Sequence, residues 1–260
     1  MDLGLKGRKA IVCAASKGLG RAAAFSLARE GVAVTLLART LETLEATAAD
    51  IRRETGATVT PVVGDVNTPE GRAAALTACP DADILVNNPG GRQVPGDFRT
   101  FDRDEWLKWF DAQMISQMAM IQGVVDGMVA RRFGRIVNIT VSFVKFPQMG
   151  FAHSHAARLA LTGAVASIAR ELVPHNVTVN NVLPGLVDTD ALRTNLQVLA
   201  ERSGRTYEAV VAERLLTCPA GRFADPSETG DLVAFLCGAQ AGFITAQNIV
   251  NDGGVYQGVF

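Results

Sequence analysis

CAASKGLG (residues 13–20) joins a short apolar run to a helix-like stretch, and this junction decides the fold of the chain. The run before it, RKAIVCAA (8–15), is typical of a buried strand. The stretch after it, GRAAAFSLAREG (20–31), has helical periodicity, with Gly31 as a C-cap. Between a strand and a helix, glycines let the backbone approach a pyrophosphate at the helix N-terminus. The junction therefore predicts a dinucleotide-binding turn, and a tight turn without a ligand is the alternative.

Outward from this turn, apolar strands alternate with helical stretches along the whole chain. Strands that are apolar throughout are typical of a parallel sheet covered on both faces. The pattern predicts an α/β fold in a single domain, residues 1–260, with a doubly wound (Rossmann) parallel sheet of seven strands and helices on both faces. Residues 190–218 include the least regular stretch, and we interpret them as a possible mobile substrate lid. The expected strands are 8–15, 32–38, 57–66, 83–88, 134–140, 176–185 and 247–254, and the expected helices are 20–31, 41–56, 103–132, 151–174 and 225–238.

The composition limits the classes of function. The chain has 260 residues, 48% of them hydrophobic and 20% charged, and a net charge of −1. This charge predicts neither a nucleic-acid surface nor an anionic membrane surface. The N-terminus lacks a secretory signal, and no apolar run is long enough to span a membrane. The four cysteines are scattered without a CxxC pair, which favours reduced thiols in a cytoplasmic protein and no zinc cluster.

The end of the second expected strand favours one of the two nicotinamide cofactors. An acidic residue there would accept hydrogen bonds from the adenosine ribose hydroxyls and repel a 2′-phosphate. This chain has Arg39 instead, and Lys17 in the glycine-rich turn is a second cation. Both residues favour NADP over NAD, because a guanidinium group pairs well with a phosphate. The alternative for Arg39 is a solvated surface charge.

Six motifs in the same order give the chain a resemblance to the short-chain dehydrogenase/reductase family along nearly its whole length. They are CAASKGLG (13–20), GDV (64–66), NNPG (87–90), GRIVNIT (134–140), VNNVLPGLVDT (179–189) and NDGG (251–254). The resemblance implies a homotetramer or homodimer built partly on the helices 104–132 and 151–174. Together with the turn and Arg39, it implies the following cofactor-binding residues: Ala14, Ser16, Lys17, Gly18, Leu19, Gly20, Arg39, Asp65, Val66, Asn87, Pro89, Gly90, Arg158, Pro184, Gly185, Val187 and Thr189.

The same resemblance implies a catalytic tetrad of Asn, Ser, Tyr and Lys. In this chain, none of the four matching positions holds the expected residue. In the family the tyrosine is the general acid/base, the lysine lowers its pKa, the serine steadies the substrate oxygen and the asparagine holds a water. Counting back from ALTGAVASIAREL places Arg158 in the lysine position and Ser154 in the tyrosine position. The serine position is Val141, beside Ser142, and the asparagine position is Gln113. The chain also resembles a divergent subgroup, similar to β-ketoacyl-carrier-protein reductases, that lacks the tetrad.

The replacements in HSHAAR (153–158) change the chemistry that is open to the site. Arginine, with a pKa above about 12, cannot shuttle a proton, and a serine hydroxyl is a weaker and shorter acid than a phenol. His153 and His155 are candidate proton donors because imidazole titrates near neutrality. Adjacent helical positions diverge by about 100°, which disfavours a serine–histidine nucleophile and a metal pair. The plain alternative is that His155 is a polar residue of the helix face and that His153 borders the cleft.

We therefore expect an NADP-dependent oxidoreductase that acts on a small carbonyl or alcohol substrate. Ser154 and Arg158 should lie one turn apart on one helix face, pointing into the cofactor cleft. One alternative is a nucleotide-binding or ligand-binding protein without hydride chemistry. Another is a non-redox reaction in the same cleft, with Arg158 binding an anionic substrate. The residues expected to line the reaction cleft are Gln113, Ser142, Ser154, His155 and Arg158.

Overall fold

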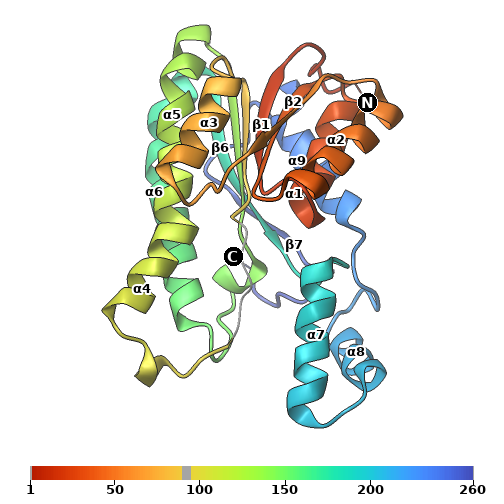
Figure 1. The fold of residues 1–260 in the computed structure, drawn as a ribbon. Coiled ribbons are helices and arrows are strands. Elements are labelled where there is room, and N and C mark those ends of the chain that lie inside the picture. The colour runs from red at the N-terminus through yellow and green to blue at the C-terminus, as the bar shows by residue number, and fades with distance from the viewer. Residues whose placement is uncertain (1, 90–94, 260) are drawn as a thin grey trace.

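The computed structural model describes residues 2–89 and 95–259. Within these ranges, a seven-stranded sheet forms the centre of the molecule, as the sequence predicts (Figure 1). The strand order is β3-β2-β1-β4-β5-β6-β7, and every neighbouring pair is parallel. The order reverses between β1 and β4, and such switch points open a crevice at the carboxyl ends of the strands. The strands are β1 (Lys9–Cys13), β2 (Ala33–Ala38), β3 (Val59–Val63), β4 (Ile84–Asn87), β5 (Gly134–Ile139), β6 (Val177–Pro184) and β7 (Asn248–Asn251).

Helices cover both faces of the sheet and enclose two buried cores. On one face α1, α2 and α9 lie together, and on the other α3, α5 and α6 do (Figure 1). Leu27, Leu36 and Val233 belong to the first core, whereas Leu85 and Met120 belong to the second. No helix of the described residues is long and apolar enough to cross a membrane. The helices are α1 (Gly18–Arg29), α2 (Leu41–Thr55), α3 (Pro69–Ala78), α4 (Arg103–Phe110), α5 (Ser116–Arg131), α6 (Ala152–Leu172), α7 (Asp190–Ser203), α8 (Tyr207–Leu216) and α9 (Pro226–Cys237).

The helix expected over 103–132 contains a π-helical turn. Asp111–Ile115 forms this turn between α4 and α5, and the backbone stays helical through Phe110 and Ser116. π-Helical turns insert one extra residue into a helix and are frequent at functional sites. The turn packs against α6, which brings Gln113 beside the helix that carries HSHAAR.

The expectation of irregular structure within 190–218 is wrong, because α7 and α8 occupy most of this segment. The side chains of Thr189 and Thr206 cap the two helices by accepting hydrogen bonds from backbone N–H groups. The helices pack on each other through Leu196, Ala200 and Val210, apart from the two main cores. Figure 1 shows the pair projecting beyond the sheet. Its role as a lid stays a prediction.

Four asparagines form a ladder of side-chain hydrogen bonds across β4, β5, β6 and β7. The strand register aligns Asn87, Asn138, Asn181 and Asn248. Each Nδ2 donates to the Oδ1 of the next residue, at 2.9, 2.9 and 2.8 Å. Buried amides of this kind stabilise a fold only while every partner is present, because an orphaned group keeps its desolvation cost. The ladder therefore helps to fix the register of four of the seven strands of the sheet.

Removing one member of this ladder should destabilise the protein strongly. In Asn138→Ala, the Nδ2 of Asn87 loses its asparagine acceptor and the Oδ1 of Asn181 loses its donor. We expect the free energy of unfolding to fall by about 2–4 kcal/mol, since each orphaned group costs about 1–3 kcal/mol. Urea denaturation measures the change. Asn67→Ala, at an exposed position, is the matched control, and equal losses in the two variants would contradict the role of the ladder.

Candidate active site

The turn between β1 and α1 has the geometry of a close backbone approach. Ala14 has φ +47° and Gly18 has φ +55°, so both lie in the left-handed region, which is strained for alanine. A Cβ atom on Gly20 would lie 2.5 Å from the carbonyl oxygen of Ala14, so only glycine fits there. Lys17, the N-cap of α1, makes no side-chain cap. The first amides of α1 are therefore available to an anion at the carboxyl edge of the sheet.

Arg39 and Asp65 lie beside each other at the ends of β2 and β3. Arg39 Nη1 is 4.0 Å from Asp65 Oδ2, and the Arg39 side chain is 72% exposed. An ion pair this long and this exposed holds the guanidinium weakly. Lys17 is also exposed and has no ion pair among the described residues. Two available cations therefore lie near the end of the crevice where the sequence predicts the adenosine half of the cofactor.

The segment after β6 returns to the glycine-rich turn. Gly185 N–H donates to the carbonyl of Asn251 at 2.9 Å, and a Cβ on Gly185 would lie 2.5 Å from Asp252 Cβ. A Cβ on Gly18 would lie 3.6 Å from Thr189 Cγ2, so Thr189 contacts the turn. Two segments predicted to hold a cofactor, the glycine-rich turn and the stretch 184–189, therefore meet at one edge of the sheet.

The remaining residues predicted to bind the cofactor have these places in the structure. Ser16 accepts a hydrogen bond from Thr47 through its carbonyl, Leu19 packs on a core, Val66 and Val187 are buried, Asn87 is buried in the ladder, Pro89 is half-buried, Pro184 ends β6, and Gly90 lies outside the described residues.

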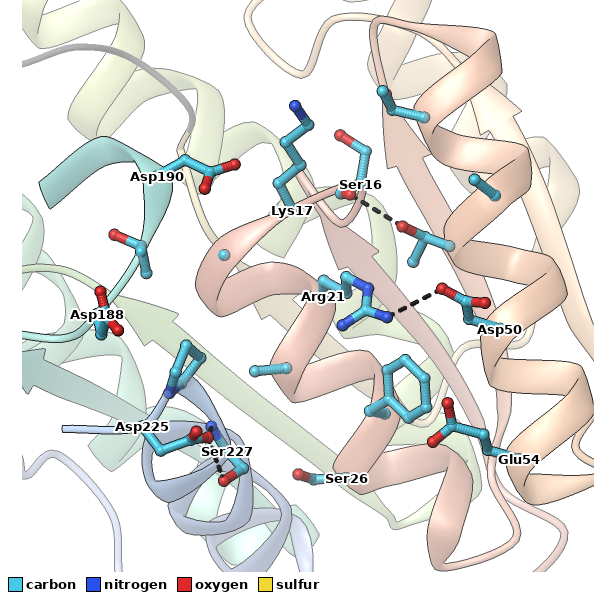
Figure 2. Close-up of a pocket in the computed structure, with 18 of the residues that line it drawn as sticks. Ser16, Lys17, Arg21, Ser26, Asp50, Glu54, Asp188, Asp190, Asp225 and Ser227 are labelled. Atoms are coloured by element: carbon cyan, nitrogen blue, oxygen red, sulfur yellow. Dashed lines mark hydrogen bonds and ion pairs between the residues drawn. The ribbon is translucent and has the colours of Figure 1, made fainter. Parts of the chain in front are cut away.

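A groove of about 570 Å³ opens beside the glycine-rich turn, along the outer face of α1. Figure 2 shows Lys17 at the turn, Asp188 and Asp190 on the opposite side, and the Arg21–Asp50 ion pair on its wall. The charges along the groove pair locally, as with Arg21 and Asp50 at 3.1 Å. The groove reaches the nucleotide end of the site, but Ser154 and Arg158 do not line it. The groove therefore lies outside the residues expected to form the reaction site.

Ser154 and Arg158 lie one turn apart on the same face of α6, as predicted. Arg158 Nε donates to Ser154 Oγ at 3.3 Å, and the two residues are 4% and 0% exposed. Burial lowers the pKa of Arg158 to about 10, so the guanidinium still carries its charge at neutral pH. Whether the pair also faces the cofactor stays a prediction.

Two further residues of the expected reaction site approach α6 from neighbouring elements. Ser142 lies in a 3₁₀ turn after β5 that packs against α6. Its side chain is fully buried, and its Oγ has no hydrogen-bond partner among the described residues. Gln113 is 2% exposed in the π-helical turn, and no described residue is a hydrogen-bond partner of its Oε1. Val141, in the family's serine position, is half-buried and brings no hydroxyl. The site therefore has two buried polar atoms, Ser142 Oγ and Gln113 Oε1, that a ligand could hydrogen-bond.

The two histidines of HSHAAR face different surroundings. The His153 ring packs 4.5 Å from Phe101 and 4.3 Å from Trp109, toward α4. The His155 ring lies 6.0 Å from Phe143, and its Nε2 is buried without a partner. Burial lowers the pKa of both histidines, so both are neutral at pH 7. Ser154 is hydrogen-bonded to Arg158 and to neither imidazole. In the described part of the chain, no group of three His, Cys, Asp or Glu residues could hold a metal ion.

Sequence reasoning missed two features beside this site. Gln117 Nε2 donates to the Gln113 carbonyl at 2.7 Å, and the Gln117 carbonyl accepts from Asn87 Nδ2 at 3.2 Å. This connects the π-helical turn to the asparagine ladder. The second feature is an aromatic wall, and its signal in the sequence is the run of aromatic residues in 143–151. The aromatic wall consists of Phe143, Phe146, Phe151 and Tyr256.

The comparisons with known proteins agree on one family. The model of the family described as "Enoyl-(Acyl carrier protein) reductase" matches residues 13–256. The 3-oxoacyl-[acyl-carrier-protein] reductase FabG of Vibrio cholerae is 32% identical over 260 residues, which cover 98% of this chain and 99% of that protein. The uncharacterized oxidoreductase YvaG of Bacillus subtilis is 30% identical over 265 residues, with full coverage of both chains. The crystal structure of L-sorbose reductase from Gluconobacter frateurii, complexed with NADPH and L-sorbose, has a TM-score of 0.94 and 27% identity, and each chain is covered completely.

Proposed function

Since the chain belongs to the short-chain dehydrogenase/reductase family, we propose that it is an NADP-dependent oxidoreductase acting on a small carbonyl or alcohol substrate. This proposal rests on the residues at the carboxyl edge of β1 and β2. There only glycine fits at Gly20, in the first turn of α1, and the N-terminus of α1 has no side-chain cap. Arg39 follows β2 with an exposed guanidinium. The relative from G. frateurii that was crystallised with NADPH supports the same cofactor.

The residues present fit an NADP molecule. The amides of α1 beyond Gly18 would hold the pyrophosphate, and Arg39 and Lys17 would pair with the 2′-phosphate. By resemblance, Asp65 would meet the adenine, and the segment from Pro184 to Thr189 would meet the nicotinamide end. When bound, NADPH supplies a hydride. The chain's own residues must then orient the substrate oxygen and provide its proton.

The atypical residues limit how the chain provides that proton. Ser154 and Ser142 carry hydroxyl groups that can donate hydrogen bonds to a substrate oxygen, in positions buried from water. Arg158 holds Ser154 in place through Nε but cannot give up a proton at neutral pH. His155 is the neighbouring group with an acid/base function, and its lowered pKa leaves it neutral. The set of Gln113, Val141, Ser154 and Arg158 therefore favours substrate binding over rapid proton transfer.

Two further properties belong to this proposal. Leu107 on α4, Ile115 in the π-helical turn and Leu159 on α6 are 40%, 48% and 46% exposed. Apolar side chains on these helices support self-association, to the homodimer or homotetramer that the resemblance implies. The four cysteines are free thiols, which supports a reducing compartment such as the cytoplasm.

Titration of both cofactors tests the proposed function. We expect NADPH to bind about tenfold or more tightly than NADH, because a charge-assisted hydrogen bond to the 2′-phosphate contributes about 1.5–3 kcal/mol. Cofactor fluorescence measures both affinities, and NADPH oxidation over a panel of ketones, aldehydes and keto acids measures turnover. Tight NADPH binding without turnover on any of them would favour the binding protein. A product formed without NADPH oxidation would favour the non-redox reaction.

A further inference from the structure

Arg158 is a buried cation that lacks a buried anion. Among the described residues its side chain has one hydrogen-bond partner, the Oγ of Ser154, and no carboxylate forms an ion pair with it. Arg135, the other buried arginine, donates from Nη1 to the carbonyls of Gly134 and Asn176 at 2.8 and 2.9 Å. An uncompensated buried charge costs several kcal/mol. The described residues offer Arg158 no anion, so a ligand that carries one would offset this cost.

Two hydroxyl groups near Arg158 can donate a hydrogen bond to a ligand. Ser154 Oγ accepts from Arg158 Nε, which leaves its own O–H for a ligand. Among the described residues, Ser142 Oγ, His155 Nε2 and Gln113 Oε1 are buried without a hydrogen-bond partner; the hydroxyl can donate, the amide oxygen accepts, and a neutral imidazole nitrogen does one or the other. The charge of Arg158 contributes to the lowered pKa of His155, which places the imidazole within its field. Unpartnered polar groups therefore gather around the charge of Arg158, and no carboxylate of the described residues forms an ion pair with it.

The aromatic wall adjoins these donors through His155. The Phe143 ring lies 6.0 Å from the His155 ring, 5.6 Å from Phe146 and 6.2 Å from Phe151. Tyr256 stacks on Phe146 at 6.0 Å with an angle of 21° between the rings. All four residues of the wall are only half-buried. A half-exposed aromatic surface favours an apolar or ring-shaped ligand body.

We propose that the reaction site takes substrates with a carboxylate group and an apolar, ring-sized body. The carboxylate binds the Nη atoms of Arg158 and the Ser154 hydroxyl, and the apolar body lies against the aromatic wall. This substrate class rests on the proposed function, which places hydride transfer at the same residues.

A carboxylate fits this site better than a phosphate. Two guanidinium nitrogens and a planar carboxylate form a bidentate pair, and among the described residues Nη1 and Nη2 of Arg158 have no hydrogen-bond partner. One guanidinium charge balances one carboxylate charge. A phosphate monoester carries nearly two charges at pH 7, and Arg158 alone would balance only one of them. The cation beside the wall, Lys145, lies over the Tyr256 ring at 5.5 Å.

Paired binding measurements test the carboxylate. The probes are 3-phenylpropanoate and its neutral isostere 3-phenylpropanamide, titrated by calorimetry into protein saturated with NADP⁺. In the wild type we expect the carboxylate to bind about tenfold or more tightly than the amide. Arg158→Met should abolish this preference. Arg170→Met, which removes an exposed arginine from the far end of α6, should retain it.

The outcomes separate this proposal from the proposed function. Three results would each overturn the carboxylate site. The first is equal affinity of the wild type for the two probes, and the second is a preference for the carboxylate that persists in Arg158→Met. The third is no binding of the carboxylate at about 10 mM, which corresponds to a very weak dissociation constant. Saturation with NADP⁺ is checked first in every variant, and its failure in the wild type would instead count against the proposed function.

Thermal unfolding gives a second readout, measured with and without the carboxylate probe. Without the probe, Arg158→Met should raise the melting temperature by about 3 °C or more, because a methionine of similar length replaces an uncompensated buried charge. Saturating 3-phenylpropanoate should raise the melting temperature of the wild type and leave that of the variant unchanged. A lower melting temperature for the ligand-free variant would show that the protein itself compensates Arg158, and it would overturn the inference.

Discussion

Arg39→Asp should reverse the cofactor preference, with the ratio of NADPH to NADH affinity falling by about 100-fold or more. The variant loses the charge-assisted hydrogen bonds to the 2′-phosphate, each about 1.5–3 kcal/mol, and places a carboxylate where that phosphate binds. The same carboxylate can accept hydrogen bonds from the ribose hydroxyls of NADH. Calorimetric titration of both cofactors measures the ratio.

Because Arg39 is highly exposed, this variant should change cofactor binding without changing the stability of the fold. The Arg39 side chain is 72% exposed, and its only ion pair among the described residues is the 4.0 Å contact with Asp65, so the fold should tolerate the change. Arg103→Asp, at another highly exposed arginine, controls for the change in net charge. An unchanged ratio in Arg39→Asp would show that Arg39 is only a surface charge and would remove the main support for NADP.

The wild-type protein should reduce simple ketones and β-ketoacyl esters about 10²–10⁴-fold more slowly than a relative with the Tyr–Lys pair, because general acid/base catalysis contributes about this factor. The resemblance places Ser154 in the tyrosine position, and a serine hydroxyl is a far weaker acid than a phenol. Steady-state NADPH oxidation measures the rate, with a relative that carries the Tyr–Lys pair as the reference. The triple variant Val141→Ser/Ser154→Tyr/Arg158→Lys restores three of the four tetrad residues and should recover part of the lost rate.

Single variants identify the proton donor if the rate proves high. An ordinary rate that survives Ser154→Ala but is abolished in His155→Gln would show that the histidine has taken over the acid role. An ordinary rate abolished in Ser154→Ala would contradict our conclusion that this serine is too weak an acid. Because burial lowers the pKa of His155, an imidazolium acid would require a rate that falls steadily as the pH rises toward 7.

The sheet and the one-turn spacing of Ser154 and Arg158 could be predicted because each rests on a strong local signal. Uninterrupted apolar runs separated by amphipathic stretches predict a parallel sheet, and the helix expected over 225–238 forms as α9, with Asp225 and Glu228 in a capping box at its start. The spacing of Ser154 and Arg158 on a helix brings them together whatever the rest of the fold does. These features depend on residues that are close in the sequence.

The features that were missed depend on contacts between distant segments. The asparagine ladder needs the register of four strands, which no single strand determines. The π-helical turn at Asp111–Ile115 has no breaker residue. The amphipathic faces of α7 and α8 are short, and they bury a small cluster that includes Leu196 and Val210. Orphaned atoms, such as Ser142 Oγ, become visible only when the packing is known.

All four thiols are buried, and this determines how fast oxidants and alkylating reagents can modify them. Burial raises the pKa of both Cys13 and Cys237 to about 12, so both are thiols and not thiolates at neutral pH. Cys79 and Cys218 are buried as well. Oxidants and alkylating reagents react with thiolates that they can reach, so in the folded state they encounter almost none. These cysteines can therefore be modified only when the fold opens transiently. The rate of modification depends on the free energy of that opening and not on the intrinsic reactivity of the sulfur.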